Sequence, residues 1–205
     1  MRIVSTMQMT RVYLGGLFLV LAVASYWAFT RSKPDTPTPR PSITTMKLTS
    51  KAFQDGGYIP SKYTCDEQSM TPPFSISDVP QDVKSLVLLM DDPDVPKALM
   101  PSGVFDHWVL YNIPPADVEF GENQYQGEVG QNGAGKAAYA GPCPPTQYQP
   151  TTHRYFFKLY ALDSTLTFVK PPTKTQVEAA MEGHIIATTT LMGLYDRLKT
   201  SKEND

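Results

Sequence analysis

The sequence predicts a mainly β domain, a β-sandwich with a single helix late in the chain. Nineteen prolines and eleven tyrosines accompany few long apolar-periodic runs, which favours strands joined by many turns. Only one segment combines a helix start signal with apolar residues at helical spacing. A closed barrel produces a similar strand pattern, but the sequence favours the sandwich.

The N-terminal segment 1–30 differs from the rest of the chain. Arg2 and Arg11 precede the apolar run 12–29, which is at the lower limit for a membrane span and longer than most signal-peptide cores. The run contains an A-x-A cleavage pattern at 22–24. A cleaved signal peptide and an N-terminal membrane anchor both imply export. We therefore expect a periplasmic or other extracytoplasmic protein, either secreted or anchored to the inner membrane.

A polar linker, 31–45, follows and contains four prolines. Prolines in a polar background favour an extended tether without a packed core. We therefore expect the globular domain to begin at Met46 and to fill the rest of the chain, 46–205. Its length of about 160 residues is ample for a sandwich core.

Four segments of the domain are predicted to be strands. Residues 46–53 alternate apolar and polar side chains, and the apolar run 85–92 indicates a central strand that is buried on both faces. The strand 107–113 is expected to place four side chains on one face: His107, Val109, Tyr111 and Ile113. The strand 153–163 is expected to place five on one face: His153, Tyr155, Phe157, Leu159 and Ala161.

One helix is predicted after Pro171-Pro172. Thr175 and Glu178 match the capping box, which marks a helix start. Helical spacing then continues through Val177, Ala180, Met181, His184, Ile185 and Thr188. His184 lies on this stripe, and we interpret it as a packing residue.

Polar residues at strand ends are candidates for a binding site. The acidic turn 91–94 follows a buried strand, where it either closes a turn or holds a carboxylate against a histidine or a ligand cation. His107 and His153 each begin a strand, and Tyr155 shares a face with His153. A single histidine at a strand start is more often structural. If the strands lie close together, however, two imidazoles and a phenol converge and can hold an oxyanion.

The loop Gly141-Pro142-Cys143-Pro144-Pro145 lies shortly before His153. Proline has no N–H and a fixed φ, so this loop cannot pair into a sheet and is predicted to form a rigid rim beside the polar side chains.

The composition excludes several classes of function. The formal net charge is −2 and no basic run occurs, so nucleic acid is not an expected partner. Two cysteines and three histidines exclude a cysteine-rich zinc module, and no two histidines have metal-ligand spacing. No serine lies in a nucleophile-elbow context. We therefore expect no metal, no cofactor and no catalytic residue.

Taken in order, these motifs resemble the phosphatidylethanolamine-binding proteins. The resemblance rests on Asp92-Pro93-Asp94-Val95-Pro96, the strand from His107, Tyr139-x-Gly-Pro-x-Pro-Pro, and His153-Arg154-Tyr155. Further matches at 63–66, 141–145, 159–163 and 180–184 point to the bacterial branch, usually labelled Raf kinase inhibitor-like. The resemblance covers 46–197, nearly the whole globular part.

The resemblance implies a sandwich of two antiparallel sheets with a C-terminal helix and a small pocket for an anion, such as the phosphate of phosphoethanolamine. It implies that the pocket is lined by Asp92, His107, Gly141, Pro142, Pro144, Pro145, His153 and Tyr155. In it, Asp92 orients His107 or meets an ammonium group. Asp106 departs from eukaryotic members, which often have a histidine there, and this departure adds negative charge. Homodimers are common among similar proteins.

Cys65 and Cys143 each lie beside one of these motifs. In an exported protein two cysteines most simply pair, and a bridge between them would pin the proline-rich rim. The alternative is two unpaired, partly buried thiols.

Three functions remain in competition. The sequence favours a binding protein for a small anionic ligand without turnover. Next comes a regulator or inhibitor of a protein partner, either a kinase or a protease. A hydrolase that uses the His/Asp cluster comes third, because Cys143 could act as a nucleophile only as a free thiol with a low pKa.

Overall fold

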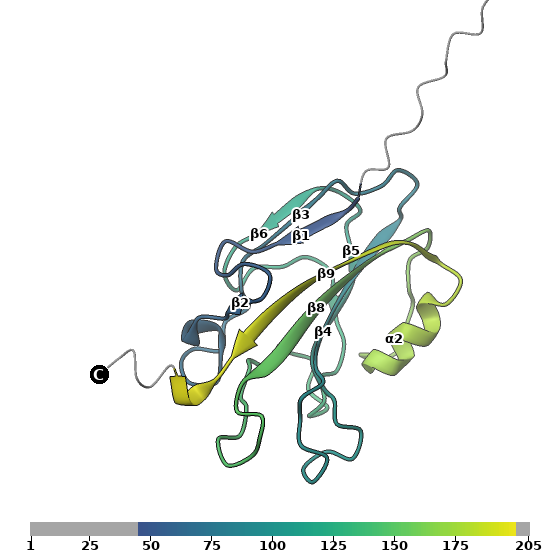
Figure 1. The fold of residues 1–205 in the computed structure, drawn as a ribbon. Helices are drawn as coiled ribbons and strands as arrows, with labels where there is room; N and C mark the ends of the chain where they lie inside the picture. The colour runs from purple at the N-terminus through teal and green to yellow at the C-terminus, as the bar shows by residue number, and fades with distance from the viewer. Residues whose placement is uncertain (1–44, 200–205) are drawn as a thin grey trace, which may run out of the picture. The chain divides into compact units, whose positions relative to one another are not determined.

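A computed structural model describes residues 45–199 of the chain (Figure 1). The strands are β1 (Lys47–Thr49), β2 (Gly57–Tyr58), β3 (Phe74–Ser77), β4 (Ser85–Asp92), β5 (Phe105–Ile113), β6 (Val118–Phe120), β7 (Glu128–Val129), β8 (His153–Leu162) and β9 (Ile185–Tyr195). Helical segments are the 3-10 turn η1 (Ser61–Tyr63), α2 (Lys174–Met181) and the last described residues, 197–199.

The predictions for the N-terminal part fall almost entirely outside this range. The segment 1–30 and all but the last residue of the linker 31–45 lie outside the described residues. Within 45–199, no helix is both long enough and apolar enough to cross a membrane.

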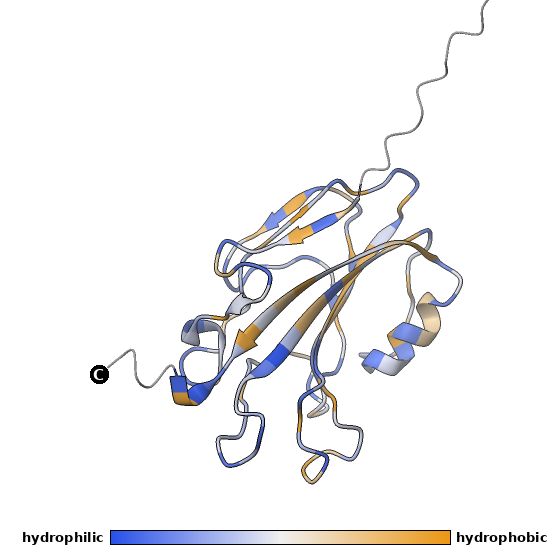
Figure 2. Cartoon of the chain, in the orientation of Figure 1, coloured by the Kyte–Doolittle hydropathy of each residue, from blue (hydrophilic) through white to orange (hydrophobic). Residues whose placement is uncertain are grey.

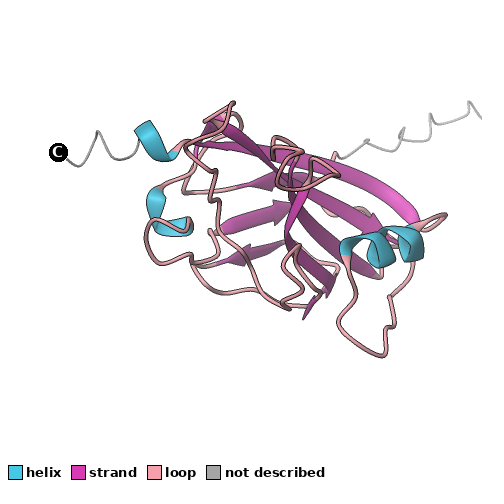
Figure 3. Ribbon diagram, turned by 90° about the horizontal axis from the view of Figure 1, so that it is seen from below, coloured by secondary structure: helices cyan, strands magenta, loops and turns pink. Residues whose placement is uncertain are grey.

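Two sheets form the sandwich, with α2 lying against the larger one (Figure 3). The smaller sheet has the order β1-β3-β6, and the larger has the order β2-β9-β8-β4-β5-β7. Neighbouring strands run antiparallel, apart from the short parallel pair of β2 with β9. The predicted mainly β sandwich with a late helix is therefore confirmed.

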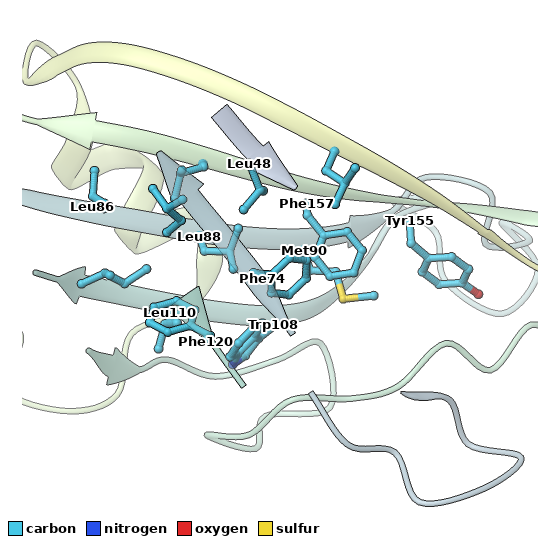
Figure 4. Close-up of a cluster of buried hydrophobic side chains, with 14 of the residues drawn as sticks. Leu48, Phe74, Leu86, Leu88, Met90, Trp108, Leu110, Phe120, Tyr155 and Phe157 are labelled. Atoms are coloured by element: carbon cyan, nitrogen blue, oxygen red, sulfur yellow. The ribbon is translucent and has the colours of Figure 1, made fainter. Parts of the chain in front are cut away.

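The main core lies between the sheets (Figure 4). A second cluster lies under α2. β4 contributes to both, with Leu86, Leu88 and Met90 on the core side and Val87 and Leu89 on the helix side. Every residue of β4 is buried, as its unbroken apolar run predicts. Figure 2 shows hydrophobic residues along the central strands.

β8 follows the predicted alternation from end to end. His153, Tyr155, Phe157, Leu159 and Ala161 are all buried on the core side. Phe157 packs against the rings of Phe53 and Phe74, with centroids 5.7 and 5.0 Å away. The face that carries the two polar residues at the start of β8 thus continues directly into the core.

β5 departs from the predicted alternation because it contains two irregularities. Met90 pairs with Trp108 but Asp91 pairs with Asp106, so His107 is an extra residue on β5, a β-bulge. The second shift lies toward the end of the strand, where Asn112 has φ of 53°. The prediction that four β5 side chains share one face is therefore wrong: Val109 and Tyr111 pack under α2, whereas the core side holds His107 and Ile113.

The predicted helix is correct in existence but wrong in its bounds. Its N-cap is Thr173, which forms a capping box with Gln176, two residues earlier than predicted. The helix ends at Met181, and Gly183 has φ of 79°, a value that terminates helices readily. The following β-branched run IIATTT forms β9 instead, because it pairs along β8.

His184 is correspondingly not a packing residue, and that interpretation is wrong. It lies in the turn between α2 and β9, where its Nδ1 lies 2.7 Å from Asp163 Oδ1. Both side chains of this pair are about half exposed.

Candidate functional site

A cavity of about 310 Å³ opens at the end of β4, where β5 and β8 begin. The loop after β4 and the loop before β8 lie at this lower end of the domain in Figure 1. The cavity is lined by six of the predicted site residues: Asp92, His107, Gly141, Pro144, Pro145 and His153. The lining also includes Cys143, which belongs to the predicted rim loop, and four residues that were not predicted: Val95, Leu99, Phe105 and Ala140.

Asp92 and His153 form a buried pair at the inner end of the cavity. Asp92 Oδ2 lies 2.6 Å from His153 Nδ1, and the two residues are 3% and 0% exposed. The other carboxylate oxygen accepts the Asp94 N–H at 2.8 Å. Because the carboxylate is an acceptor, it fixes the proton on Nδ1 of His153 and leaves Nε2 on the opposite side of the ring.

Asp94 ties the acidic turn to β8. Its carboxylate accepts two hydrogen bonds from the Arg154 guanidinium, at 2.8 and 2.6 Å, and one from the Arg154 backbone N–H. The Arg154 side chain holds the pKa of this carboxyl below its usual range. The acidic turn is therefore both a turn and a site element, and the two interpretations of the sequence are compatible.

His107 is oriented by the backbone of the rim rather than by Asp92. Its Nδ1 lies 2.6 Å from the carbonyl oxygen of Ala140, whereas its Nε2 is 4.0 Å from Asp92 Oδ2. Burial lowers the pKa of His107, so the imidazole is neutral and donates from Nδ1. In the structure Asp92 therefore pairs with His153, in contrast to the expectation that Asp92 orients His107.

The lowered pKa of His107 predicts a loss of stability in acid. The unfolded chain binds a proton near the ordinary histidine pKa of about 6.5, whereas the folded protein resists it. Stability is therefore complete above this pH and decreases as the pH falls below it. Urea denaturation of wild type and His107→Gln between pH 7.5 and 5 measures the effect, and we expect the variant to lose less stability. An equal loss in both proteins would contradict the assignment of the acid sensitivity to His107. Asp92 and His153 also face this imidazole and would be the next groups to test.

Tyr155 lies behind the two histidines rather than in the cavity wall. Its ring meets His107 edge-on at 5.2 Å and stacks with His153 at 6.5 Å. Burial, with the charge of Asp92, raises the pKa of the phenol, so it stays protonated. Figure 4 shows the hydroxyl pointing away from the core cluster. The predicted convergence of two imidazoles and a phenol is observed.

Two polar atoms of this group lack a hydrogen bond of ordinary geometry. They are His153 Nε2 and the Tyr155 hydroxyl, both buried, and neither forms a hydrogen bond of ordinary geometry with residues 45–199. Although Asp92 is close enough to raise the pKa of the phenol, it does not accept a well-formed bond from it. A buried polar atom without a partner costs about 1–3 kcal/mol, so these two atoms need an explanation.

The rim is held against the loop after η1. Cys65 and Cys143 form a disulfide, and the Cys65 N–H donates to the Pro142 carbonyl at 3.1 Å. Pro142 is buried outside the cavity lining, so its contribution is to this contact. A Cβ on Gly141 would lie 2.5 Å from Ser69 Oγ and 2.8 Å from the Tyr63 carbonyl, so only glycine fits at the start of the rim.

Asp106 points away from the cavity, toward α2. Its carboxylate lies 3.5 Å from Lys174 Nζ, which also approaches Asp91 and Glu178. Because Lys174 offsets its charge, Asp106 adds less negative charge to the pocket than the sequence comparison suggests. No cluster of three or more potential metal ligands occurs in the part of the chain that the structure describes.

The residues missed by sequence reasoning are mainly apolar. Val95 lies inside the acidic-turn motif, so its position beside Asp92 was a usable signal. Leu99 and Phe105 carried none, because an apolar residue in or after a loop is indistinguishable from a core residue in a single sequence.

Comparison with known proteins shows the family of the chain. The sequence profile described as phosphatidylethanolamine-binding protein matches residues 49–196. The chain belongs to the phosphatidylethanolamine-binding protein family. A relative named UPF0098 protein from Chlamydia trachomatis is 46% identical over 153 residues, which are 74% of this chain and 99% of the relative. A second, from Methanothermobacter thermautotrophicus, is 45% identical over 159 residues, again 74% of this chain and 99% of the relative.

Solved structures of the phosphatidylethanolamine-binding protein family show the same fold. A crystal structure of a putative family homologue from Chlamydia trachomatis superposes with a TM-score of 0.71 at 45% identity, over 75% of this chain and 99% of the other. E. coli YbcL, described as a member of the mammalian family, superposes with a TM-score of 0.64 at 23% identity. The superposition covers 74% of this chain and 98% of YbcL. At 23% identity, this similarity supports the shared fold alone.

Proposed function

We propose that this protein binds a small anion, phosphate or a phosphoethanolamine-like head group, in the cavity beside Asp92 and His153 without turning it over. The observation that supports the proposal is the pair of buried, unpartnered polar atoms, His153 Nε2 and the Tyr155 hydroxyl. A ligand oxygen that accepts from the Tyr155 hydroxyl, or a protonated phosphate oxygen that donates to His153 Nε2, would remove the cost of leaving that atom unpaired.

The polar groups beside the cavity can meet a phosphate with both a donor and an acceptor. Asp92 accepts the proton of His153 Nδ1, which leaves the Nε2 lone pair to accept a hydrogen bond from a protonated phosphate oxygen. The Tyr155 hydroxyl is the matching donor for an unprotonated phosphate oxygen. His107 stays neutral because its N–H is directed to Ala140 and its ring is buried.

The cavity is larger than a phosphate group alone needs. Its apolar lining is formed by Val95, Leu99, Phe105 and the prolines of the rim. This lining suits an organic group attached to the phosphate, while the polar floor meets the anion.

Hydrolysis is less well supported than binding. The Asp92–His153 pair has the form of an orienting carboxylate and a base, but a hydrolase that forms a covalent intermediate also needs a nucleophile. Cys143 is bonded to Cys65 and is not a free thiol. The residues that line the cavity include no serine or threonine.

Several finer features of the proposal rest on the sequence and its resemblance. The protein is exported and is either secreted or anchored in the membrane by its N-terminal segment. A protein partner, such as a kinase or protease under regulation, and a homodimer remain predictions. Fractionation of cells and sedimentation equilibrium test the location and the oligomeric state directly.

Thermal-shift titration of the full-length protein with phosphate, phosphoethanolamine and acetate tests the pocket. We expect phosphate compounds to raise Tm, because a ligand at a hundred times its Kd stabilises the native state by about 2.7 kcal/mol. Tyr155→Phe should reduce the shift with little loss of stability, since the hydroxyl forms no hydrogen bond of ordinary geometry with the described residues. His153→Ala should abolish the shift.

His184→Ala is the matched control. His184 is also paired with an aspartate, but it is half exposed and does not line the cavity. It should retain the full shift. The proposal fails if no anion at millimolar concentration stabilises wild type, or if Tyr155→Phe responds as wild type does.

A further inference from the structure

The disulfide between Cys65 and Cys143 lies at the mouth of the cavity and is accessible to solvent. Cys143 lines the cavity directly, and both cysteines belong to the exposed residues of the chain. A disulfide that carries only stability is usually sheltered, whereas an exposed one can be attacked by an external thiolate.

The Cys65 side of the bridge is firmly anchored. Thr64 closes the 3-10 turn through its N–H and its hydroxyl, both of which donate to the Ser61 carbonyl. Asp66 accepts from the Tyr195 hydroxyl at 2.7 Å and forms an ion pair with Arg197 at 2.7 Å. This loop therefore keeps its position without help from the disulfide.

The Cys143 side is held much less firmly. Its backbone is anchored before the cysteine at Gly141 and Pro142, and next at Thr151 and Thr152, whose hydroxyls donate to Asp196. Between these anchors, among the described residues, the one hydrogen bond formed by 144–150 is internal, from Tyr148 N–H to the Pro145 carbonyl. The disulfide is thus the last cross-link before a stretch whose first two residues, Pro144 and Pro145, form part of the cavity wall.

We propose that the Cys65–Cys143 disulfide is a reversible redox site, and that its reduction releases the wall 143–150 and weakens anion binding. The thiolate of a dithiol attacks one cysteine Sγ, breaks the S–S bond and forms a mixed disulfide. The second thiol then displaces the cysteine. Two electrons and two protons pass to Cys65 and Cys143, which become thiols, and the dithiol becomes a disulfide.

The effect of reduction on affinity depends on the fraction of molecules in which the released wall occupies its binding position. Pro144 and Pro145 line the cavity, and Pro144 is buried against it. If the reduced wall occupies its binding position about a tenth of the time, the apparent Kd rises about tenfold. The polar floor is untouched, because the hydrogen bonds of Asp92, His107 and His153 do not involve the bridge.

Two measurements on the full-length protein test this inference, which in its effect on affinity rests on the proposed function. Calorimetric titration with inorganic phosphate gives Kd before and after treatment with dithiothreitol. Limited proteolysis with subtilisin, with cleavage sites located by mass spectrometry, reports the release of 143–150 whether or not phosphate binds. We expect reduction to raise Kd about tenfold and to expose cleavage sites in 143–150 alone.

The double variant Cys65→Ser/Cys143→Ser is the control for the reductant. It should behave as the reduced wild type does, with or without dithiothreitol. Wild type that binds phosphate equally well in both redox states overturns the gating of affinity. No new cleavage within 143–150 on reduction overturns the release of the wall. Absence of phosphate binding in the oxidised protein instead counts against the proposed function, and the cleavage pattern still decides whether the wall is released.

Discussion

Asp92→Ala is expected to destabilise the domain by about 2–6 kcal/mol, because it leaves two hydrogen-bond donors without an acceptor, at about 1–3 kcal/mol each. His153 would lose the acceptor of its Nδ1–H while remaining fully buried, and the Asp94 N–H would also lose its acceptor. Urea denaturation measured at neutral pH gives the change in the free energy of unfolding. The acidic turn would loosen with it, since Asp92 closes that turn.

Asp163→Ala provides a matched control in the same chain. Asp163 and His184 make a contact of nearly the same length, 2.7 Å, but about half of each side chain is exposed. Exposed pairs contribute little because water screens them, so this variant should change stability by about 0.5 kcal/mol or less. Similar losses for the two variants would contradict the role given to burial at Asp92.

Asp92→Asn separates the charge from the shape. An amide keeps an acceptor oxygen for the Asp94 N–H and can still meet His153, so a smaller loss of stability is expected than for alanine. It removes the acceptor-only partner that fixes the proton of His153 on Nδ1, so Nε2 is no longer held as an acceptor for the ligand and phosphate binding should weaken. A variant that binds as wild type does would show that His153 needs no carboxylate.

The sequence is sufficient for elements whose side-chain pattern is set by burial alone. β4 is buried on both faces and has an unbroken apolar run, and β8 has one face on the core and alternates throughout. In both, each residue's environment follows from its position along a regular strand. The alternation of β8 alone therefore predicts correctly that His153 and Tyr155 share one face.

The elements and contacts that the sequence did not predict depend on pairing with strands that are distant in the chain. The run IIATTT after Met181 continues a helical stripe, but its β-branched residues pair along β8 and become β9. His107 and Ile113 reach the core side because β5 is bulged against β4, and no local pattern marks those bulges. The bulge at His107 also explains why the expectation that Asp92 orients His107 is wrong. It leaves the imidazole facing the rim carbonyl, and Asp92 pairs with His153 instead.

Loss of the disulfide is the second large expected effect. The bridge joins residues 78 apart, and removing such a constraint from the unfolded chain lowers stability by roughly 4 kcal/mol in the chain-entropy model. Cys65→Ser/Cys143→Ser and reduced wild type should show the same loss in urea denaturation at 25 °C. A loss below about 1 kcal/mol would indicate that the unfolded chain gains little freedom when the bridge is absent.

This global effect and the proposed release of the wall are physically separate. The first arises in the unfolded state and applies to the whole cooperative unit, so it leaves ligand contacts in the folded protein unchanged. The second arises in the folded state and is confined to 143–150, the part of the rim with the fewest bonds to the rest of the described domain. Titration of folded, reduced protein at low temperature therefore isolates the second effect: a raised Kd there comes from the wall itself, because unfolding is negligible.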